Sequence, residues 1–107
     1  MDNAMKNVAP GAIPDEAPIQ VTLLTQAHCG LCEDAEDILG RLAREYPLTL
    51  TSVNLASAEG HHLALRYGII FAPGVLLDGS FFSYGRLSER KLRRALAARL
   101  AARVPGA

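Results

Sequence analysis

The chain has 107 residues, enough for one small domain with a single hydrophobic core and too few for two. Half of the residues are hydrophobic, and 11 basic side chains balance 11 acidic ones, which argues against disorder and against general binding of nucleic acid. The 2 cysteines exclude the multiply bridged framework of small secreted domains, so we expect a reducing compartment.

The first 18 residues are expected to form a flexible N-terminal arm, and residues 19–104 the folded domain. The arm contains Pro10, Pro14 and Pro18 and few large apolar side chains. It therefore cannot bury enough apolar surface to offset the conformational entropy that ordering would cost. It holds no apolar signal core, and no stretch of the chain approaches the ~20 apolar residues needed to span a bilayer. We therefore expect a cytoplasmic protein that does not bind membranes.

Regular patterns begin with residues 19–25, an apolar run that predicts a strand. A helix follows from about Gly30 to Tyr46, and Pro47 ends it. The apolar residues that recur at helical spacing, and that should form its buried face, are Cys32, Ala35, Leu39, Leu42, Ala43 and Tyr46.

Residues 48–55 alternate in part and are rich in Thr, Ser and Val, as in a half-buried strand. Ser57 can cap a short helix that runs to Tyr67, and Gly68 suits the left-handed position that ends a helix. The residues of this helix that should face inward are Leu63, Ala64 and Tyr67.

The Asp78-Gly79 pair predicts a two-residue hairpin turn between strands at residues 74–77 and 80–84. Neighbouring Phe81 and Phe82 should point to opposite faces, so one of them needs cover from the other helical layer. The aromatic residues expected to lie mostly in the core are Phe71, Phe81, Phe82 and Tyr84.

Ser88 is expected to cap a final helix that reaches about Arg103. Its basic residues are most simply a face exposed to water, with docking of an acidic partner as the alternative. The order βαβαββα predicts an α/β fold with a mixed four-stranded sheet and helices on both faces. The residues of the final helix that should face the core are Leu92, Ala95, Leu96 and Leu100.

A Cys-x-x-Cys pair, Cys29 and Cys32, lies at the junction between the first strand and the first helix. The unpaired N–H groups and positive dipole of a helix N-terminus stabilise a thiolate, which is the nucleophile in disulfide exchange. Cys29 should face solvent and attack the target disulfide. Cys32 lies about one helical turn away on the buried face of the helix and should resolve the mixed disulfide. These cysteines are the expected catalytic residues.

Two other interpretations of the pair stay open. The sulfurs could form a static structural disulfide or stay inert in a binding module. Alternatively, Cys29 and Cys32 could join His61 and His62 in a zinc or iron–sulfur site. Adjacent helical residues point in different directions, which argues against the two histidines as ligands, so we expect no metal.

The element order, the Cys-x-x-C pair and a proline before the third strand together resemble the thioredoxin superfold in its short glutaredoxin-like form, over residues 19–103. The resemblance implies a thiol-disulfide oxidoreductase with a part in cell redox homeostasis. It also implies that Pro73 is cis and lies beside the sulfurs, and that Ala72 offers its backbone to an extended substrate. Ala72, Pro73 and His28 are the expected substrate-binding residues.

The motif differs from that of thioredoxins proper, which carry Trp-Cys-Gly-Pro-Cys. Here His28 precedes the pair and Leu31 lies inside it. A protonated His28 would raise the thiolate fraction of Cys29, and the alternative is an ordinary exposed loop side chain.

Glutaredoxins that use glutathione usually have a lysine before the first cysteine and a Gly-Gly-x-Asp-like turn before the last helix. This chain has Gln26 at the first place and Gly85-Arg86-Leu87-Ser88 at the second. Gly85, Arg86 and Ser88 at a helix N-terminus could hold a small carboxylate such as that of glutathione.

The expected partners follow from this chemistry. They are protein or small-molecule disulfides as substrates, and glutathione or an enzyme of the thioredoxin-reductase type as the electron source. No bound cofactor is required, nucleic acid is not an expected ligand, and a domain of this size is expected to be a monomer.

Overall fold

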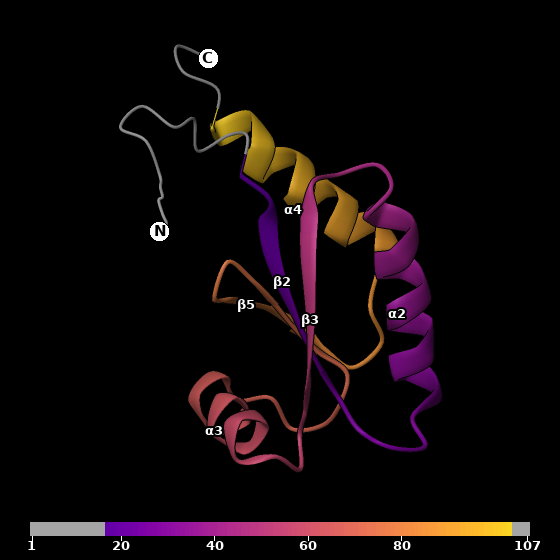
Figure 1. The fold of residues 1–107 in the computed structure, drawn as a ribbon, viewed down its shortest axis with the longest axis vertical. Helices are drawn as coiled ribbons and strands as arrows, with labels where there is room; N and C mark the ends of the chain where they lie inside the picture. The colour runs from indigo at the N-terminus through magenta and orange to yellow at the C-terminus, as the bar shows by residue number, and fades with distance from the viewer. Residues whose placement is uncertain (1–16, 104–107) are drawn as a thin grey trace, which may run out of the picture.

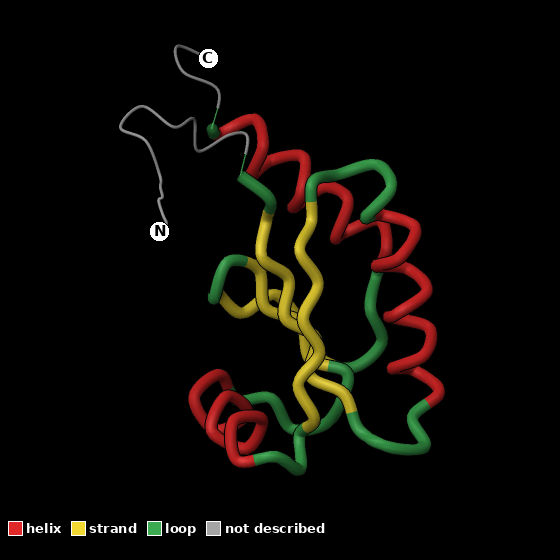
Figure 2. The backbone as a smooth tube through the Cα atoms, in the orientation of Figure 1, coloured by secondary structure: helices red, strands yellow, loops and turns green. Residues whose placement is uncertain are grey.

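The computed structural model describes residues 17–103, so residues 1–16 of the predicted N-terminal arm lie outside it. The predicted order βαβαββα is confirmed (Figures 1 and 2). None of the helices among the described residues combines the length and the apolar character that crossing a bilayer requires. The elements are β2 (Ile19–Thr25), α2 (Gly30–Leu42), β3 (Leu48–Asn54), α3 (Ala58–Tyr67), β4 (Gly74–Leu77), β5 (Ser80–Tyr84) and α4 (Glu89–Ala102).

The strands form one mixed sheet in the order β3-β2-β4-β5. β2 is parallel to β3 and antiparallel to β4, and β4 is antiparallel to β5. Helices α2 and α4 lie against one face and α3 lies against the other, as the two core clusters show (Figure 1). The predicted α/β fold class is therefore confirmed.

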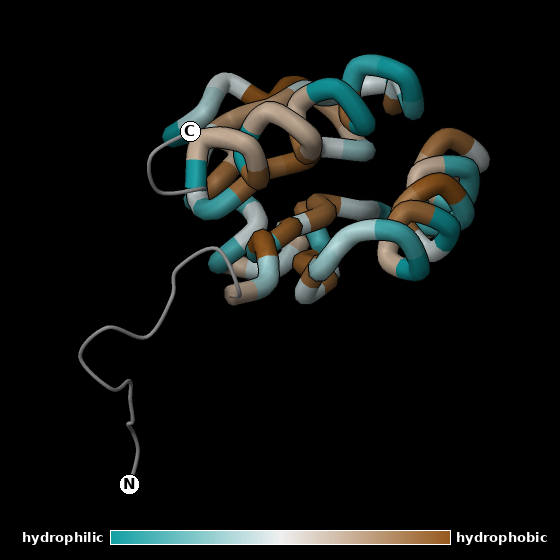
Figure 3. Tube along the Cα trace, turned by 90° about the horizontal axis from the view of Figure 1, so that it is seen from above, coloured by the Kyte–Doolittle hydropathy of each residue, from teal (hydrophilic) through white to brown (hydrophobic). Residues whose placement is uncertain are grey.

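The core has two parts, one on each face of the sheet. The larger joins the sheet to α2 and α4, and the smaller joins it to α3. Hydrophobic and hydrophilic residues alternate along the helices in Figure 3, as helices packed on a sheet require. The fully or nearly buried residues include Val21, Leu23, Leu39, Leu42, Val75, Leu77, Leu92 and Leu96 in the larger part, and Leu24, Ile69 and Leu76 in the smaller.

The predicted caps of α3 and α4 are confirmed. The hydroxyl of Ser57 accepts the N–H of Gly60 at 3.0 Å, and that of Ser88 accepts the N–H of Lys91 at 3.2 Å. Gly68 ends α3 in the left-handed conformation, with φ 69°. Side-chain caps satisfy N–H groups that the first turn leaves without partners, so the sequence itself fixes where these helices begin.

Helix α2 ends at Leu42, four residues before the predicted Tyr46. Beyond Leu42 the bonds shift to the tighter spacing, with the N–H of Glu45 donating to the carbonyl of Leu42 at 2.9 Å. Ala43 is exposed and Tyr46 is half-buried, so the prediction that Ala43 belongs to the buried face was wrong.

β3 is more exposed than the predicted half-buried strand. Of the strands that the structure describes, only β2 pairs with it, and only Val53 of its residues is buried. Leu50 lies opposite Val21, on the face that carries α2 and α4, yet it is 44% exposed. The edge position explains the exposure, because among residues 17–103 no second strand lies beyond β3.

The basic face of α4 is exposed to water, as predicted, and part of it also forms ion pairs. Arg93 holds Glu45 with both terminal nitrogens, at 2.6 and 2.7 Å, and Glu89 at 3.2 Å. Arg41 of α2 also binds Glu89, at 2.6 Å. The hydrogen bond from Arg93 lowers the pKa of Glu45, and that from Arg41 is the largest cause of the lowered pKa of Glu89. The Arg41–Glu89 pair joins α2 to α4, and the Arg93–Glu45 pair joins α4 to the loop after α2.

The predicted Asp78-Gly79 turn is confirmed, with φ 49° and 80° at the two residues. One carboxylate oxygen of Asp78 accepts the N–H of Gln20 at 2.9 Å. The other lies 3.3 Å from Arg99 and 3.6 Å from Arg103. The turn is thus tied to the start of β2 and the end of α4.

Candidate active site

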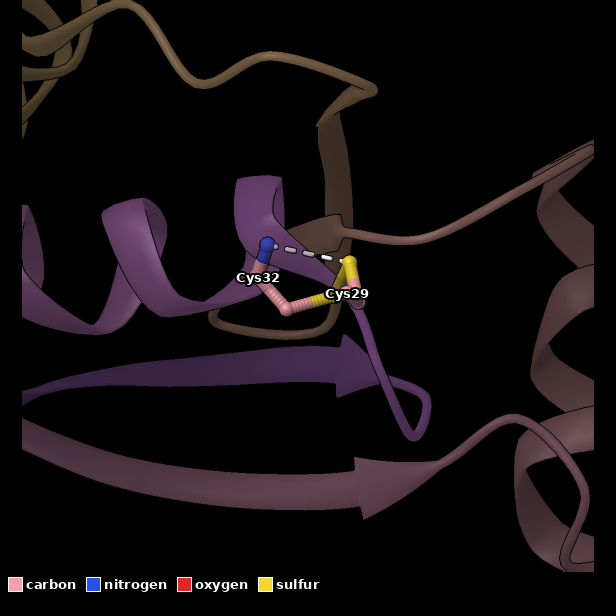
Figure 4. Close-up of a disulfide and its surroundings, with 2 residues drawn as sticks. All are labelled: Cys29 and Cys32. Carbon is pink, nitrogen blue, oxygen red and sulfur yellow. Dashed lines mark hydrogen bonds between the residues drawn. A yellow bond between two sulfur atoms is a disulfide. The ribbon is translucent and has the colours of Figure 1, made fainter.

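The Cys29–Cys32 pair forms a disulfide at the start of α2, with Cα atoms 5.2 Å apart (Figure 4). Cys29 is the N-cap residue, with extended backbone angles of φ −122° and ψ 101°. Its sulfur accepts the backbone N–H of Cys32 at 3.0 Å. The sulfur of Cys29 therefore takes the place that a hydroxyl or carboxylate usually holds at a helix start, where the helix stabilises negative charge.

The two sulfurs differ in access, as predicted. Cys32 is 3% exposed and lies on the inward stripe of α2, whereas Cys29 is partly exposed. The burial follows from helical spacing, because Cys32 is followed at three and seven residues by the buried Ala35 and Leu39. An external disulfide could thus approach Cys29 first.

The Ala72–Pro73 peptide bond is cis, as the resemblance implied. It immediately precedes Gly74, which lies opposite Leu24 near the end of β2. This register brings Pro73 to the end of the sheet from which the chain continues to Cys29.

Ala72 and Pro73 are both buried, and the carbonyl of Pro73 accepts the N–H of Gly85 at 2.8 Å. Within residues 17–103, nothing donates to the C=O of Ala72 or accepts its N–H.

His28 is exposed and adopts the left-handed conformation, with φ 54°. Such a backbone is uncommon for a residue with a side chain and is most often found at turns and functional sites. Its part in substrate binding stays a prediction.

The three residues predicted to hold a carboxylate have different surroundings. Gly85 is buried, with φ 82°, and its N–H is already bonded to Pro73. The hydroxyl of Ser88 caps α4. Arg86 is exposed and makes none of the ion pairs found among residues 17–103, so it is the group of the three that could still meet an anion.

Arg86 also lines a hollow of about 290 Å³ between α2 and the loop that leads to α4. Sequence analysis did not find this hollow, because its walls come from segments separated by some fifty residues. Charges of both signs line it, so an anion at Arg86 would also meet nearby carboxylates. The other lining residues are Asp34, Asp37, Ile38, Arg41 and Leu87.

The alternative metal site is not assembled in the part of the chain that the structure describes. No three Cys, His, Asp or Glu side chains come together there as ligands would. His61 and His62 are exposed in the first half of α3.

Three of the aromatic side chains expected in the core are instead partly exposed. Phe82 packs on the larger core cluster. In contrast, Phe71, Phe81 and Tyr84 keep between a third and a half of their surface open. The sequence does predict that Phe81 and Phe82 face opposite sides of the sheet. It does not show that neighbouring residues leave Phe81 45% exposed.

Comparison with known proteins agrees with this geometry. Residues 20–97 match the family described as "Glutaredoxin-like domain (DUF836)". An uncharacterized protein of Mycobacterium tuberculosis is 35% identical over 81 residues, which are 73% of this chain and 82% of that protein. A "Probable Thioredoxin" of Archaeoglobus fulgidus is 25% identical over 76 residues, 71% of this chain and 84% of that protein.

Two solved structures share the fold. A mutant thioredoxin from Halobacterium salinarum superposes with a TM-score of 0.60 at 20% identity, over 80% of this chain and 78% of that one. A thioredoxin-like protein from Clostridium perfringens gives 0.64 at 13% identity, over 77% and 71% of the chains. The chain therefore belongs to the glutaredoxin-like (DUF836) family and has the thioredoxin fold.

Proposed function

We propose that the protein is a dithiol-disulfide oxidoreductase that exchanges electrons with protein or small-molecule disulfides. The observation that carries this proposal is the redox pair at the start of α2, with one sulfur partly exposed and the other buried. A structural crosslink gains most when it closes a long loop, and this one joins residues only three apart. Redox exchange explains the placement better than structural support.

The reduced protein begins the reaction with Cys29 as a thiolate. The N–H of Cys32 and the dipole of α2 favour its negative charge, which lowers the free energy of the anion relative to the thiol. The thiolate attacks one sulfur of the target disulfide. A bond forms between Cys29 and that sulfur, the target disulfide breaks, and the other target sulfur leaves as a thiolate.

Cys32 then resolves the mixed disulfide. Its proton passes to the target thiolate released in the first step or to water. Its sulfur then attacks that of Cys29, forms the Cys29–Cys32 bond and releases the second target sulfur as a thiolate. Two electrons have passed to the target, and the protein is left in the oxidised form that the structure describes. A thiol reductant reverses these steps on the protein, and the class we propose is glutathione or an enzyme of the thioredoxin-reductase type.

The Ala72–Pro73 segment is proposed to align the substrate. The free N–H and C=O of Ala72 would pair with the backbone next to the target cysteine, as a short added strand. His28 and Arg86 are proposed to contact the substrate or the reductant from the exposed rim. The proposed setting is the cytoplasm, where thiol reductants keep such pairs available and serve redox homeostasis.

Two cysteine variants test the assignment. Cys29→Ser should abolish exchange, and serine keeps a side chain that can cap α2, so lost activity would report on the sulfur rather than on the fold. Cys32→Ser should accumulate the mixed disulfide with a model substrate, detected by mass spectrometry without reductant. Normal turnover by Cys32→Ser would contradict the assigned roles.

The electron source is tested separately. The unaltered protein is incubated with hydroxyethyl disulfide and either glutathione or a thioredoxin reductase with its nicotinamide cofactor. Turnover with one reductant identifies the partner, whereas no exchange with either, or with dithiothreitol, would refute the proposed activity.

A further inference from the structure

Phe71, Tyr84 and Phe81 form a row of exposed rings, called here the aromatic row. The ring centres of Phe71 and Tyr84 are 5.2 Å apart, and those of Tyr84 and Phe81 are 6.4 Å apart. The three side chains are 49%, 37% and 45% exposed, respectively. Rings of this size are usually covered in a small domain, so exposed neighbours of this kind mark a contact surface.

The row begins at the proposed substrate site. Phe71 directly precedes Ala72, whose backbone groups have no partner among residues 17–103. Tyr84 lies opposite Gly74, and Phe81 lies opposite Leu76, two residues further along β4. The row therefore leads from the cis peptide bond outward along β5, the edge strand of the sheet.

The rings are held in place without a ligand. Phe71 meets Tyr84 edge to face, with an angle of 88° between the ring planes. A Cβ atom on Gly85 would lie 3.3 Å from the Phe71 ring, so the absence of a side chain there lets the ring settle against the backbone. A surface already ordered loses little conformational entropy when a partner binds.

We propose that the aromatic row binds the polypeptide that carries the target disulfide, so that the protein prefers protein disulfides to small ones. This step rests on the proposed function. An extended chain anchored at Ala72 places side chains on one face about 6.6 Å apart, close to the spacing of the rings. None of the three rings carries a charge, so the matching segment has apolar side chains near its reactive cysteine.

The test compares two substrates of different size. Phe81→Ser removes the ring furthest along the row from Ala72, and Leu50→Ser is the matched control. Leu50 is 44% exposed, as Phe81 is 45% exposed, but it lies on the opposite edge and the opposite face of the sheet. Rates are measured with insulin and with hydroxyethyl disulfide, in both cases with dithiothreitol as the electron source.

For Phe81→Ser we expect kcat/KM with insulin to fall about tenfold, the effect of removing an aromatic anchor from an interface, while the rate with hydroxyethyl disulfide stays within about twofold. Phe81→Leu keeps an apolar side chain and should retain most of the insulin activity. Leu50→Ser should match the unaltered protein with both substrates.

The outcomes separate this inference from the proposed function. Unchanged insulin activity in Phe81→Ser, or an equal loss with both substrates, would overturn the role of the aromatic row alone. Circular dichroism of each variant identifies a loss caused by unfolding. If Phe81→Ser is unfolded, Phe71→Ser, which removes the ring at the other end of the row, is compared with both substrates instead: a loss with insulin alone supports the inference, and no loss or an equal loss overturns it. If the unaltered protein reduced neither disulfide, the proposed function would fail and this inference with it.

Discussion

Gly60 lies where the first turn of α3 meets the end of β3, and replacing it with alanine should destabilise the fold. A Cβ atom at this position would overlap the carbonyl oxygen of Asn54 and lie 2.8 Å from its carbon and 2.9 Å from the Cα of Leu55. That oxygen is itself anchored, because it accepts the N–H of Ser57 at 3.0 Å and the Ser57 hydroxyl at 2.6 Å. Backbone held in this way cannot move aside as a flexible side chain would.

The magnitude follows from two opposing effects. Alanine favours a helix over glycine by about 0.5–1 kcal/mol, whereas forcing atoms into occupied space costs about 1–3 kcal/mol or more when the obstacle is backbone. To relieve the overlap, α3 must lift from the sheet and loosen the packing of Leu63 and Tyr67 on Leu24. We expect Gly60→Ala to lower the free energy of unfolding by about 2 kcal/mol, a fall in Tm of roughly 8–16 °C.

Gly40→Ala is the matched control, because Gly40 is also helical and has nothing within 4 Å of an added Cβ. This variant should gain about 0.5–1 kcal/mol from helix propensity alone. Chemical denaturation followed by circular dichroism gives both values. If Gly60→Ala were as stable as the unaltered protein or more so, the close contact between α3 and Asn54 would be refuted.

Two further predictions concern the helices. Because the folded-state pKa values of Glu45 and Glu89 lie below the ordinary 4.5, their ion pairs stabilise the protein above that pH, and the stabilisation is lost as the pH falls through the lowered values. Arg93→Ala should therefore weaken the pH dependence of the unfolding free energy below pH 4.5. Arg90→Ala, on the same helix, is the control and should leave it unchanged. The unfolding free energy is measured by denaturant titrations at several pH values, and equal pH profiles for Arg93→Ala and the unaltered protein would contradict this prediction. Ser57→Ala should cost about 0.5–2 kcal/mol by loss of its cap, measured by the same titrations, and no loss would argue against the capped start of α3.

Features set by local chemistry could be predicted from the sequence. Ser57 and Ser88 begin helices because their hydroxyls accept N–H groups three residues on, and Asp78-Gly79 turns the chain because both residues tolerate positive φ. The placement of Cys29 at a helix start follows from the same kind of signal, an apolar run followed by a helical pattern.

Features set by distant packing could not be predicted. The alternation in β3 does not show that the strand has a neighbour on one side only, so the exposure of Leu50 was missed. The end of α2 was predicted too late because Ala43 and Tyr46 fit the helical period even though the turns tighten there. The ring contact between Phe71 and Tyr84 joins the loop before β4 to the end of β5, and no local pattern of the sequence brings these two residues together.

The hydrogen bond of 2.6 Å from Arg103 to the carbonyl of Ala17 has a practical consequence. It brings the first and last described residues together at one pole of the domain, and β2 runs from there toward the redox pair at the other (Figure 1). A resin, a probe or a second protein attached at Ala17 or Arg103 would therefore lie at the pole opposite the partly exposed Cys29.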